Sequence, residues 1–314
     1  MIIRRLVKAG QASHTVSLPK DWIERNRLKK GDLVYLYEKG NSELVISPEK
    51  KSSEDLPAKE ITINVDGKEL STVQREVTSA YINNFNTIIL VGDSLTKRIK
   101  DFRSIIHDFV ALEVADQTSR SLVAKDLLNL KEISIDKTVR RMDMLVRSMV
   151  QDCFASIDDP NLSQSVVVRD YEVNRAYFLL LRLLKSALNN KSIADFFSLN
   201  NDRILSYYYL VVNLENFGDA AIQLVELLVK EKKKDKLKNV FAVVEKGYLD
   251  VMKAYFTKNK ALADSVALQR KALIERISGL SPGTSEVLKT MVTLTNNIAR
   301  IVIDESLEGV VGKK

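Results

Sequence analysis

Two carboxylates spaced four residues apart are the first feature of this sequence that could do chemistry. Glu215 and Asp219 would lie on one face of a helix, because residues four apart are neighbours on a helical surface. Asp170 and Asn174 repeat this spacing earlier in the chain. Such a pair can hold a cation when a second pair faces it, whereas a lone pair weakens a helix slightly by like-charge repulsion. The spacing therefore leaves open a cation site or a solvated polar patch.

Positive charge near the N-terminus is the second feature. Residues 1–50 contain ten Lys and Arg against six Asp and Glu, a net charge of +4, while the whole chain carries +7. Arg4 and Lys8 would share one face of a strand, and Arg5 would point to the other face. Such side chains neutralise phosphates, and arginine can also read base edges in the major groove. The pattern favours a polyanionic partner such as nucleic acid, although the same charge could simply solvate an exposed strand.

The composition excludes several kinds of site. Cys153 is the only cysteine, so neither an intrachain disulfide nor a thiolate metal cage can form, and a reducing cytoplasm is expected. His14 and His107 have no evident acidic or nucleophilic partners in the sequence, and no glycine-rich phosphate loop occurs. We therefore predict that the protein is not an enzyme. No apolar run of about 18 residues and no signal-peptide core is found, so we expect no membrane insertion.

The elements that must position these residues form a multi-domain, mainly α-helical chain. Residues 1–48 follow a β-β-α-β-β pattern that is too small for much of a core, and residues 49–59 form a polar linker. Residues 60–135 follow β-α-β-α-β-β, typical of a small α/β unit with one sheet, which would be a spacer or would contact a ligand or protein. In residues 136–306 the apolar spacing predicts six helices in two sets of three, and residues 307–314 form a tail.

Two short motifs give the first 48 residues a family resemblance. Ser17-Leu18-Pro19-Lys20 and Lys29-Lys30-Gly31-Asp32 resemble, in type and spacing, the SpoVT-AbrB DNA-binding domain, also called the swapped-hairpin barrel. In that family two chains interleave to close one barrel, so the resemblance implies a homodimer. It also implies that the first strands and hairpins of both subunits face DNA. The residues expected on this face are Arg4, Arg5, Lys8, Gln11, Ser13 and His14.

The helical part resembles the PhoU family of phosphate-uptake regulators. Members of that family have two three-helix repeats with carboxylate motifs on long helices. Two stretches here are similar to those motifs: residues 214–221, Leu-Glu-Asn-Phe-Gly-Asp-Ala-Ala, and residues 169–177, Arg-Asp-Tyr-Glu-Val-Asn-Arg-Ala-Tyr. An AbrB-like domain joined to such repeats is similar to the archaeal phosphate-uptake regulators.

The resemblance to PhoU implies metal binding, but this sequence departs from the family pattern. Asn174 stands where the family has an aspartate, and Asp264 is followed four residues later by Leu268, so the second repeat lacks its carboxylate pair. An amide ligand lowers the affinity for hard cations, which prefer anionic oxygen. We therefore expect at most one weakly bound divalent or ferric ion, held by Asp170, Glu215 and Asp219.

Together these resemblances predict a cytoplasmic, homodimeric, DNA-binding transcriptional regulator of phosphate uptake. The barrel would bind operator DNA, and the PhoU-like bundle would sense or relay phosphate status. The alternative is an adaptor that controls a phosphate transporter or a signalling kinase through the bundle, with the barrel serving only for dimerisation. Specific binding of DNA by residues 1–48 would distinguish the two.

Overall fold

The chain folds into two units, Met1–Pro57 and Ala58–Lys314. The computed structural model describes residues 3–10, 13–39, 43–49, 59–228 and 231–311. The predicted linker at residues 49–59 lies almost wholly outside the described residues. Helices dominate the second unit, so the prediction of a multi-domain, mainly α-helical chain with a β-rich N-terminal region is confirmed.

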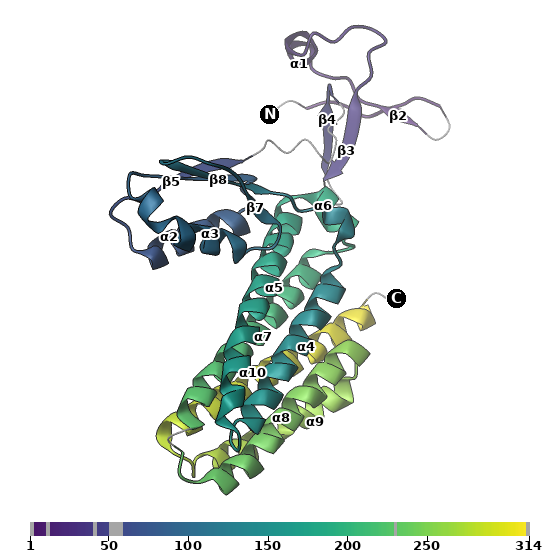
Figure 1. Cartoon of the computed structure of the whole chain (residues 1–314). Helices are drawn as coiled ribbons and strands as arrows, with labels where there is room; N and C mark the ends of the chain where they lie inside the picture. The colour runs from purple at the N-terminus through teal and green to yellow at the C-terminus, as the bar shows by residue number, and fades with distance from the viewer. Residues whose placement is uncertain (1–2, 11–12, 40–42, 50–58, 229–230, 312–314) are drawn as a thin grey trace. The chain divides into compact units, whose positions relative to one another are not determined.

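The described residues of the N-terminal unit form two β-hairpins and one short helix (Figure 1). The helix starts directly after Pro19, which has an extended backbone, and Gly31 adopts a φ of +97° in the turn that follows. In that turn the Asp32 carboxylate accepts a hydrogen bond from the backbone N–H of Lys29 at 2.6 Å. The elements are β1 (Val7–Lys8) paired with β2 (His14–Thr15), α1 (Lys20–Arg25), and β3 (Tyr35–Lys39) paired with β4 (Glu43–Ser47).

The first hairpin is shorter than the sequence pattern predicts. Arg4 and Arg5 were expected on the first strand, but β1 contains only Val7 and Lys8, so both arginines precede it. The described part of this unit forms two separate two-stranded sheets and no closed barrel. Its only buried side chain among those described is Ser47, because one copy of so short a segment cannot enclose a core.

A four-stranded sheet follows, as the β-α-β-α-β-β pattern predicts. Its order is β5-β6-β8-β7; β5 and β6 are parallel, and the other pairs are antiparallel. Ile88 and Leu90 alternate with half-buried residues along β6, and α2 and α3 cover that buried face (Figure 1). The bounds are β5 (Glu60–Asn64), α2 (Leu70–Ile82), β6 (Thr87–Val91), α3 (Ile99–His107), β7 (Leu112–Gln117) and β8 (Ser121–Asp126).

The described residues after the sheet contain six long helices in two sets of three, as predicted. The first set is α4 (Ile135–Ala155), α5 (Ser163–Asn189) and α7 (Asn201–Leu228), with the short α6 (Lys191–Phe196) between the last two. The second set is α8 (Lys234–Thr257), α9 (Lys260–Ile277) and α10 (Pro282–Val311), and α10 also packs against α7. The last helix continues past residue 306, so residues 307–311 belong to α10 and not to a tail. None of the described helices is long and apolar enough to cross a membrane.

A buried arginine joins the α/β unit to the helices. Arg182 of α5 forms an ion pair with Asp126 at the end of β8, and its Nε donates to Asn84 Oδ1 at 3.1 Å. The guanidinium lies 4.6 Å from the centre of the Tyr81 ring. Since Phe178 of α5 also packs against Phe109 at 5.5 Å, polar and apolar contacts together hold α2 along α5.

A buried carboxylate ties two turns together at one end of the bundle. Glu231, between α7 and α8, accepts hydrogen bonds from the backbone N–H groups of Lys233 (2.9 Å) and Ser281 (3.1 Å). Burial raises the pKa of Glu231, but bonds from the hydroxyl and N–H of Ser281 and the N–H of Lys233 outweigh it and lower the pKa to about 2. Because Ser281 directly precedes α10, this carboxylate compensates the positive end of a long helix.

We predict that Glu231→Gln destabilises the protein in a pH-dependent way. The lowered folded pKa means that the ionised carboxylate stabilises the fold above its unfolded pKa, and that this contribution is lost as the pH falls from about 4.5 toward about 2. At pH 7 the variant should lose about 1–3 kcal/mol of unfolding free energy. Denaturant titrations at pH 7 and at decreasing pH measure the difference.

Glu286→Gln is the matched control, because Glu286 is exposed on the first turns of α10. It should change stability little at any pH. An equal loss in both variants, or a Glu231→Gln effect that does not shrink in acid, would contradict the assignment.

Candidate functional site

The predicted carboxylates meet between α5 and α7. Asp170 lies on α5, and Glu215 and Asp219 lie on α7, which packs directly against it. All three are half-buried, and no lysine or arginine among the described residues forms an ion pair with any of them. We call Asp170, Glu215 and Asp219 the acidic cluster. The sequence identified its members, and the structure brings them together.

Asn174 is part of the same region but turns toward its neighbour. Its Nδ2 donates to Asp170 Oδ2 at 2.8 Å. The other oxygen of that carboxylate, Oδ1, is buried and has no hydrogen-bond partner. A buried, unpartnered carboxylate oxygen is costly, and a proton or a cation on it removes that cost.

Burial and mutual repulsion raise the pKa values of the acidic cluster. Burial, and then the nearby Asp219 charge, raise the pKa of Asp170 to about 6. Burial, and then the charges of Asp219 and Asp170, raise the pKa of Glu215 to about 7. Burial also raises the pKa of Asp219. At neutral pH the cluster is therefore poised between a protonated and a fully charged state.

The side chains do not form a ready metal centre. In the part of the chain that the structure describes, no three His, Cys, Asp or Glu side chains are grouped so as to hold a metal ion. Asn174 also does not act as a ligand here, because its amide N–H group points at Asp170 and donates a hydrogen bond to it. The donor set is anionic oxygen, which suits a hard cation, but its present arrangement does not fit a metal cluster.

A tyrosine that the sequence pattern did not single out lies beside the cluster. Tyr177 belongs to an apolar stripe by its spacing, yet burial, and then the nearby Glu215 carboxylate, raise the pKa of its hydroxyl to about 12. Its position seven residues after Asp170, two turns along the same helix, was the available signal. Tyr177 therefore keeps its proton at neutral pH and is available as a hydrogen-bond donor.

The proposed DNA-contacting residues lie on and around the first hairpin. Lys8 pairs directly with His14 across β1 and β2, and Ser13 Oγ donates to Ala9 O. Lys8, His14 and Ser13 are exposed, as are the two arginines before β1. Neither arginine nor Lys8 has an acidic partner among the described residues. Gln11, the sixth predicted residue, lies outside the described residues.

The N-terminal unit also exposes an unusual amount of apolar surface. Leu6 is 68% exposed and Leu33 is 74% exposed, although leucine is normally buried. The other exposed apolar residues of this unit are Ile3, Val7, Val16, Leu36, Leu44 and Val45. They come from both hairpins and from the loop between α1 and β3. Exposed apolar surface of this density marks an interaction site.

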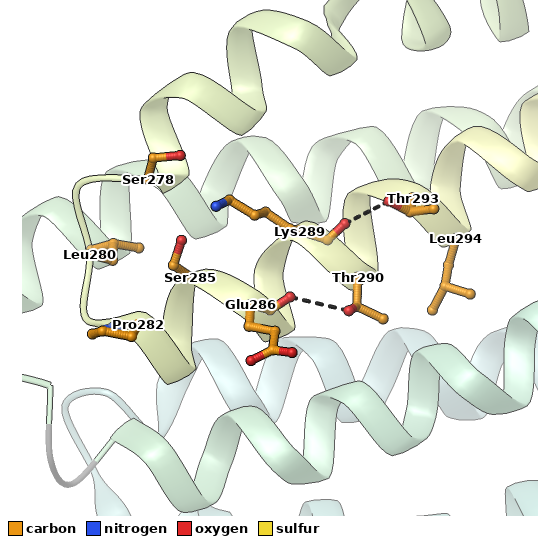
Figure 2. A pocket seen from close by; sticks show the side chains of 9 residues that line it. All are labelled: Ser278, Leu280, Pro282, Ser285, Glu286, Lys289, Thr290, Thr293 and Leu294. Carbon is orange, nitrogen blue, oxygen red and sulfur yellow. Dashed lines mark hydrogen bonds between the residues drawn. The ribbon is translucent and has the colours of Figure 1, made fainter.

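A hollow of about 590 Å³ lies where α9 turns into α10, far from any predicted site residue in the sequence. Figure 2 shows Lys289 and Ser285 on one side of the α10 backbone, with the Glu286 carboxylate directed away from them. Ser285 Oγ is buried without a hydrogen-bond partner. The hollow is lined by one cation, Lys289, and one anion, Glu286. The start of α10 next to it is already compensated by the carboxylate of Glu231.

We predict that Glu215→Gln stabilises the protein at alkaline pH. The raised folded pKa means that the unfolding free energy falls as the pH rises from about 4.5 through about 7, because the folded state resists ionisation. The amide removes this cost. The variant should gain roughly 1 kcal/mol at pH 8, after allowance for solvent screening, and little at pH 5.

Glu226→Gln, an exposed change on the same helix, should be neutral at both pH values. A Glu215→Gln variant that is destabilised at pH 8 would contradict the interpretation.

Metal analysis of the same samples, purified without chelator, supplies a second check. More than one equivalent of iron or zinc per chain, lost in Glu215→Gln, would overturn the expectation of at most one weakly held ion.

Comparisons with known proteins match both parts of the chain. Residues 12–54 match the family model for the antidote-toxin recognition protein MazE, a bacterial antitoxin, and residues 139–228 match the model for the PhoU domain. The PhoU match covers α4 to α7, which is the set of helices that carries the acidic cluster. No match is found among the curated proteins.

Two solved structures are similar to part of the chain. The crystal structure of PhoU from Pseudomonas aeruginosa has 20% sequence identity and a TM-score of 0.48, covering 56% of this chain and 96% of that one. The phosphate transport system regulatory protein PhoU from Streptococcus pneumoniae has 15% identity and a TM-score of 0.41, covering 59% and 96%. These bacterial structures do not bear on the predicted archaeal origin. The two family matches show that the chain combines a MazE- and AbrB-like N-terminal domain with a PhoU domain.

Proposed function

We propose that the protein is a homodimeric, non-enzymatic, DNA-binding regulator of phosphate uptake that acts in the cytoplasm. The N-terminal domain would bind operator DNA, and the PhoU domain would sense or relay phosphate status. The observation that carries this proposal is the N-terminal unit itself, which exposes its apolar residues and a cluster of cations that have no acidic partner in the described part of the chain. The match to an antitoxin domain and to a PhoU domain supports it.

The apolar surface supports dimerisation through residues 1–48. The described N-terminal side chains bury almost nothing, so this unit gains little hydrophobic stabilisation as a single copy. A second copy of the same segment would supply matching hairpins, and an interface between identical patches is the usual arrangement in a twofold dimer. Dimerisation would also bring the two basic hairpins into one assembly.

The cations support DNA as the partner of the first hairpin. Arg4, Arg5 and Lys8 follow one another within five residues and lack acidic partners among the described residues. Twofold symmetry would double them to six, and each phosphate contact releases counterions. Arginine adds the capacity for paired hydrogen bonds to guanine.

The PhoU domain supports a role in phosphate regulation, and the acidic cluster is its most distinctive chemical feature. The match of residues 139–228 to the PhoU domain supports this role, and we propose that the chain regulates phosphate transport. A change of protonation, or one weakly bound cation, at Asp170, Glu215 and Asp219 would alter the contact between α5 and α7. An adaptor that controls a transporter or kinase through the helices, with the N-terminal domain only for dimerisation, is the alternative.

We predict that Leu36→Glu disrupts the dimer. Leu36 is 57% exposed in the single chain, so the substitution should leave the subunit fold intact, but it would place a charge inside the proposed interface. Sedimentation or light scattering at low micromolar concentration should show monomers. Leu268→Glu, at a position 77% exposed on α9, is the matched control and should remain dimeric. Dimers of Leu36→Glu would show that other surfaces hold the subunits together.

We predict that the double substitution Arg4→Ala and Arg5→Ala weakens DNA binding. The loss should be about 1–3 kcal/mol for each arginine that reads a base, with a shallower dependence of affinity on salt. Binding to genomic fragments selected with the wild-type protein measures both effects. Arg270→Ala with Lys271→Ala, an exposed adjacent pair on α9, is the control.

The same experiment separates the two functions. If the wild-type protein selects no genomic fragments, or if both double variants bind alike, the adaptor is favoured over the DNA-binding regulator. If Arg4→Ala with Arg5→Ala abolishes selection while the protein stays dimeric, the hairpin contacts DNA.

A further inference from the structure

A groove with a volume of about 570 Å³ runs between α2 of the α/β unit and α5 of the helical part. Both helices belong to the same unit, and the contacts of Arg182 and Phe178 described above fix one against the other. The volume lies in the range of small-molecule sites. Nothing in the sequence patterns pointed to this place, because its two walls are about one hundred residues apart.

Two cations face this groove from opposite walls. Arg75 comes from α2 and Lys185 comes from α5. Arg75 donates one hydrogen bond to Thr72 Oγ1 at 3.1 Å, and neither cation forms an ion pair with any described residue. A third ammonium, Lys59 Nζ, lies 3.4 Å from the carbonyl oxygen of Asn83, another lining residue. No aspartate or glutamate is among the lining residues that the structure describes, so the lining itself is positively charged, and the Asp108 carboxylate lies beside it at Gln74.

Five of the seven remaining lining residues are polar, and Ile82 and Phe178 supply apolar surface. Asn83 and Gln74 use their amide nitrogens within the protein, on Ser79 O at 2.8 Å and Asp108 at 3.4 Å. Their side-chain oxygens accept no hydrogen bond from the described residues and are available to a donor. Phe178 is half-buried and supplies an aromatic surface. The groove thus offers cations, hydrogen-bond acceptors and one ring together.

We propose that this groove binds a phosphate-bearing small ligand, of the size of a nucleotide. Arginine and lysine are the usual partners of phosphate oxygens, and Arg75 keeps most of its N–H groups free for such contacts. The amide oxygens suit the exocyclic amino groups of a base, and Phe178 suits its ring. An uncharged apolar ligand would gain nothing from Arg75 and Lys185, whose exposed side chains would stay hydrated beside it.

A ligand in this position would contact both walls and so stabilise the attachment of the α/β unit to α5. That helix also carries Asp170, so the groove and the acidic cluster would act on the same element. The site gives the α/β unit a role as a sensor for a soluble phosphate compound. It goes beyond the proposed DNA binding and does not depend on it.

The test is equilibrium binding of ATP, AMP and inorganic phosphate to the full-length protein at low salt. We expect one saturable site per chain. Arg75→Ala combined with Lys185→Ala should weaken binding at least tenfold, whereas Arg75→Lys combined with Lys185→Arg should retain it. Lys100→Ala with Arg103→Ala, an exposed pair on α3 outside the groove, is the charge-matched control and should bind normally.

A second measurement locates the ligand. Bound ATP should slow amide hydrogen exchange in α2 and around residues 178–185 in the wild-type protein. Inorganic phosphate that binds as tightly as ATP would identify free phosphate as the source, and binding of ATP or AMP alone would identify a nucleotide. Both outcomes support the site.

Three outcomes would overturn the proposal. They are the absence of saturable binding of all three probes, unchanged binding in Arg75→Ala with Lys185→Ala, and loss of binding in Arg4→Ala with Arg5→Ala. The last would place the ligand on the N-terminal cations. Because that variant tests DNA binding separately, failure of the groove and failure of the DNA-binding proposal can be told apart.

Discussion

The buried contact of Arg182 with Asp126 and Asn84 is the constraint on which the arrangement of the larger unit depends. A guanidinium removed from water costs several kcal/mol unless a carboxylate and hydrogen bonds compensate it. Here Asp126 supplies the charge, and Asn84 accepts from both Arg182 and Ser186. These contacts form only when the α/β unit packs on α5 in a single orientation. The groove between α2 and α5 is a consequence of that position.

Helix α5 therefore serves two sites at once. Its N-terminal half contributes Asp170 and Asn174 to the acidic cluster, and its C-terminal half contributes Phe178, Arg182 and Lys185 to the contact with α2. The cluster costs stability, because burial and like charge raise the pKa values of its members. Half-buried, mutually repelling carboxylates of this kind are typical of functional sites. A rigid helix between the two places is a simple physical route for coupling them.

The N-terminal unit has the opposite problem, since it lacks a core. Turn chemistry fixes its local form, with Pro19 before the helix and Gly31 in the turn after it, yet the leucines of its hairpins remain exposed. Local structure without burial is worth little free energy in water. A second copy of matching shape, as proposed above, would supply the burial that a single copy lacks.

The sequence by itself determined the elements and the types of domain. Apolar spacing located the six long helices, the β-branched run Thr87–Val91 marked a strand, and two short motifs identified the N-terminal domain. These signals are local, because hydrophobic period and turn residues act over a few positions.

Only the tertiary structure decided which residues meet. It placed Asp170 against the carboxylates of α7, turned Asn174 toward Asp170, and set Arg75 across a groove from Lys185. It also gave the first hairpin only two paired positions, Val7 with Thr15 and Lys8 with His14. The physical reason is that contacts between distant segments depend on how whole helices pack. The apolar spacing along one helix shows which of its faces is buried, but not which other helix covers that face.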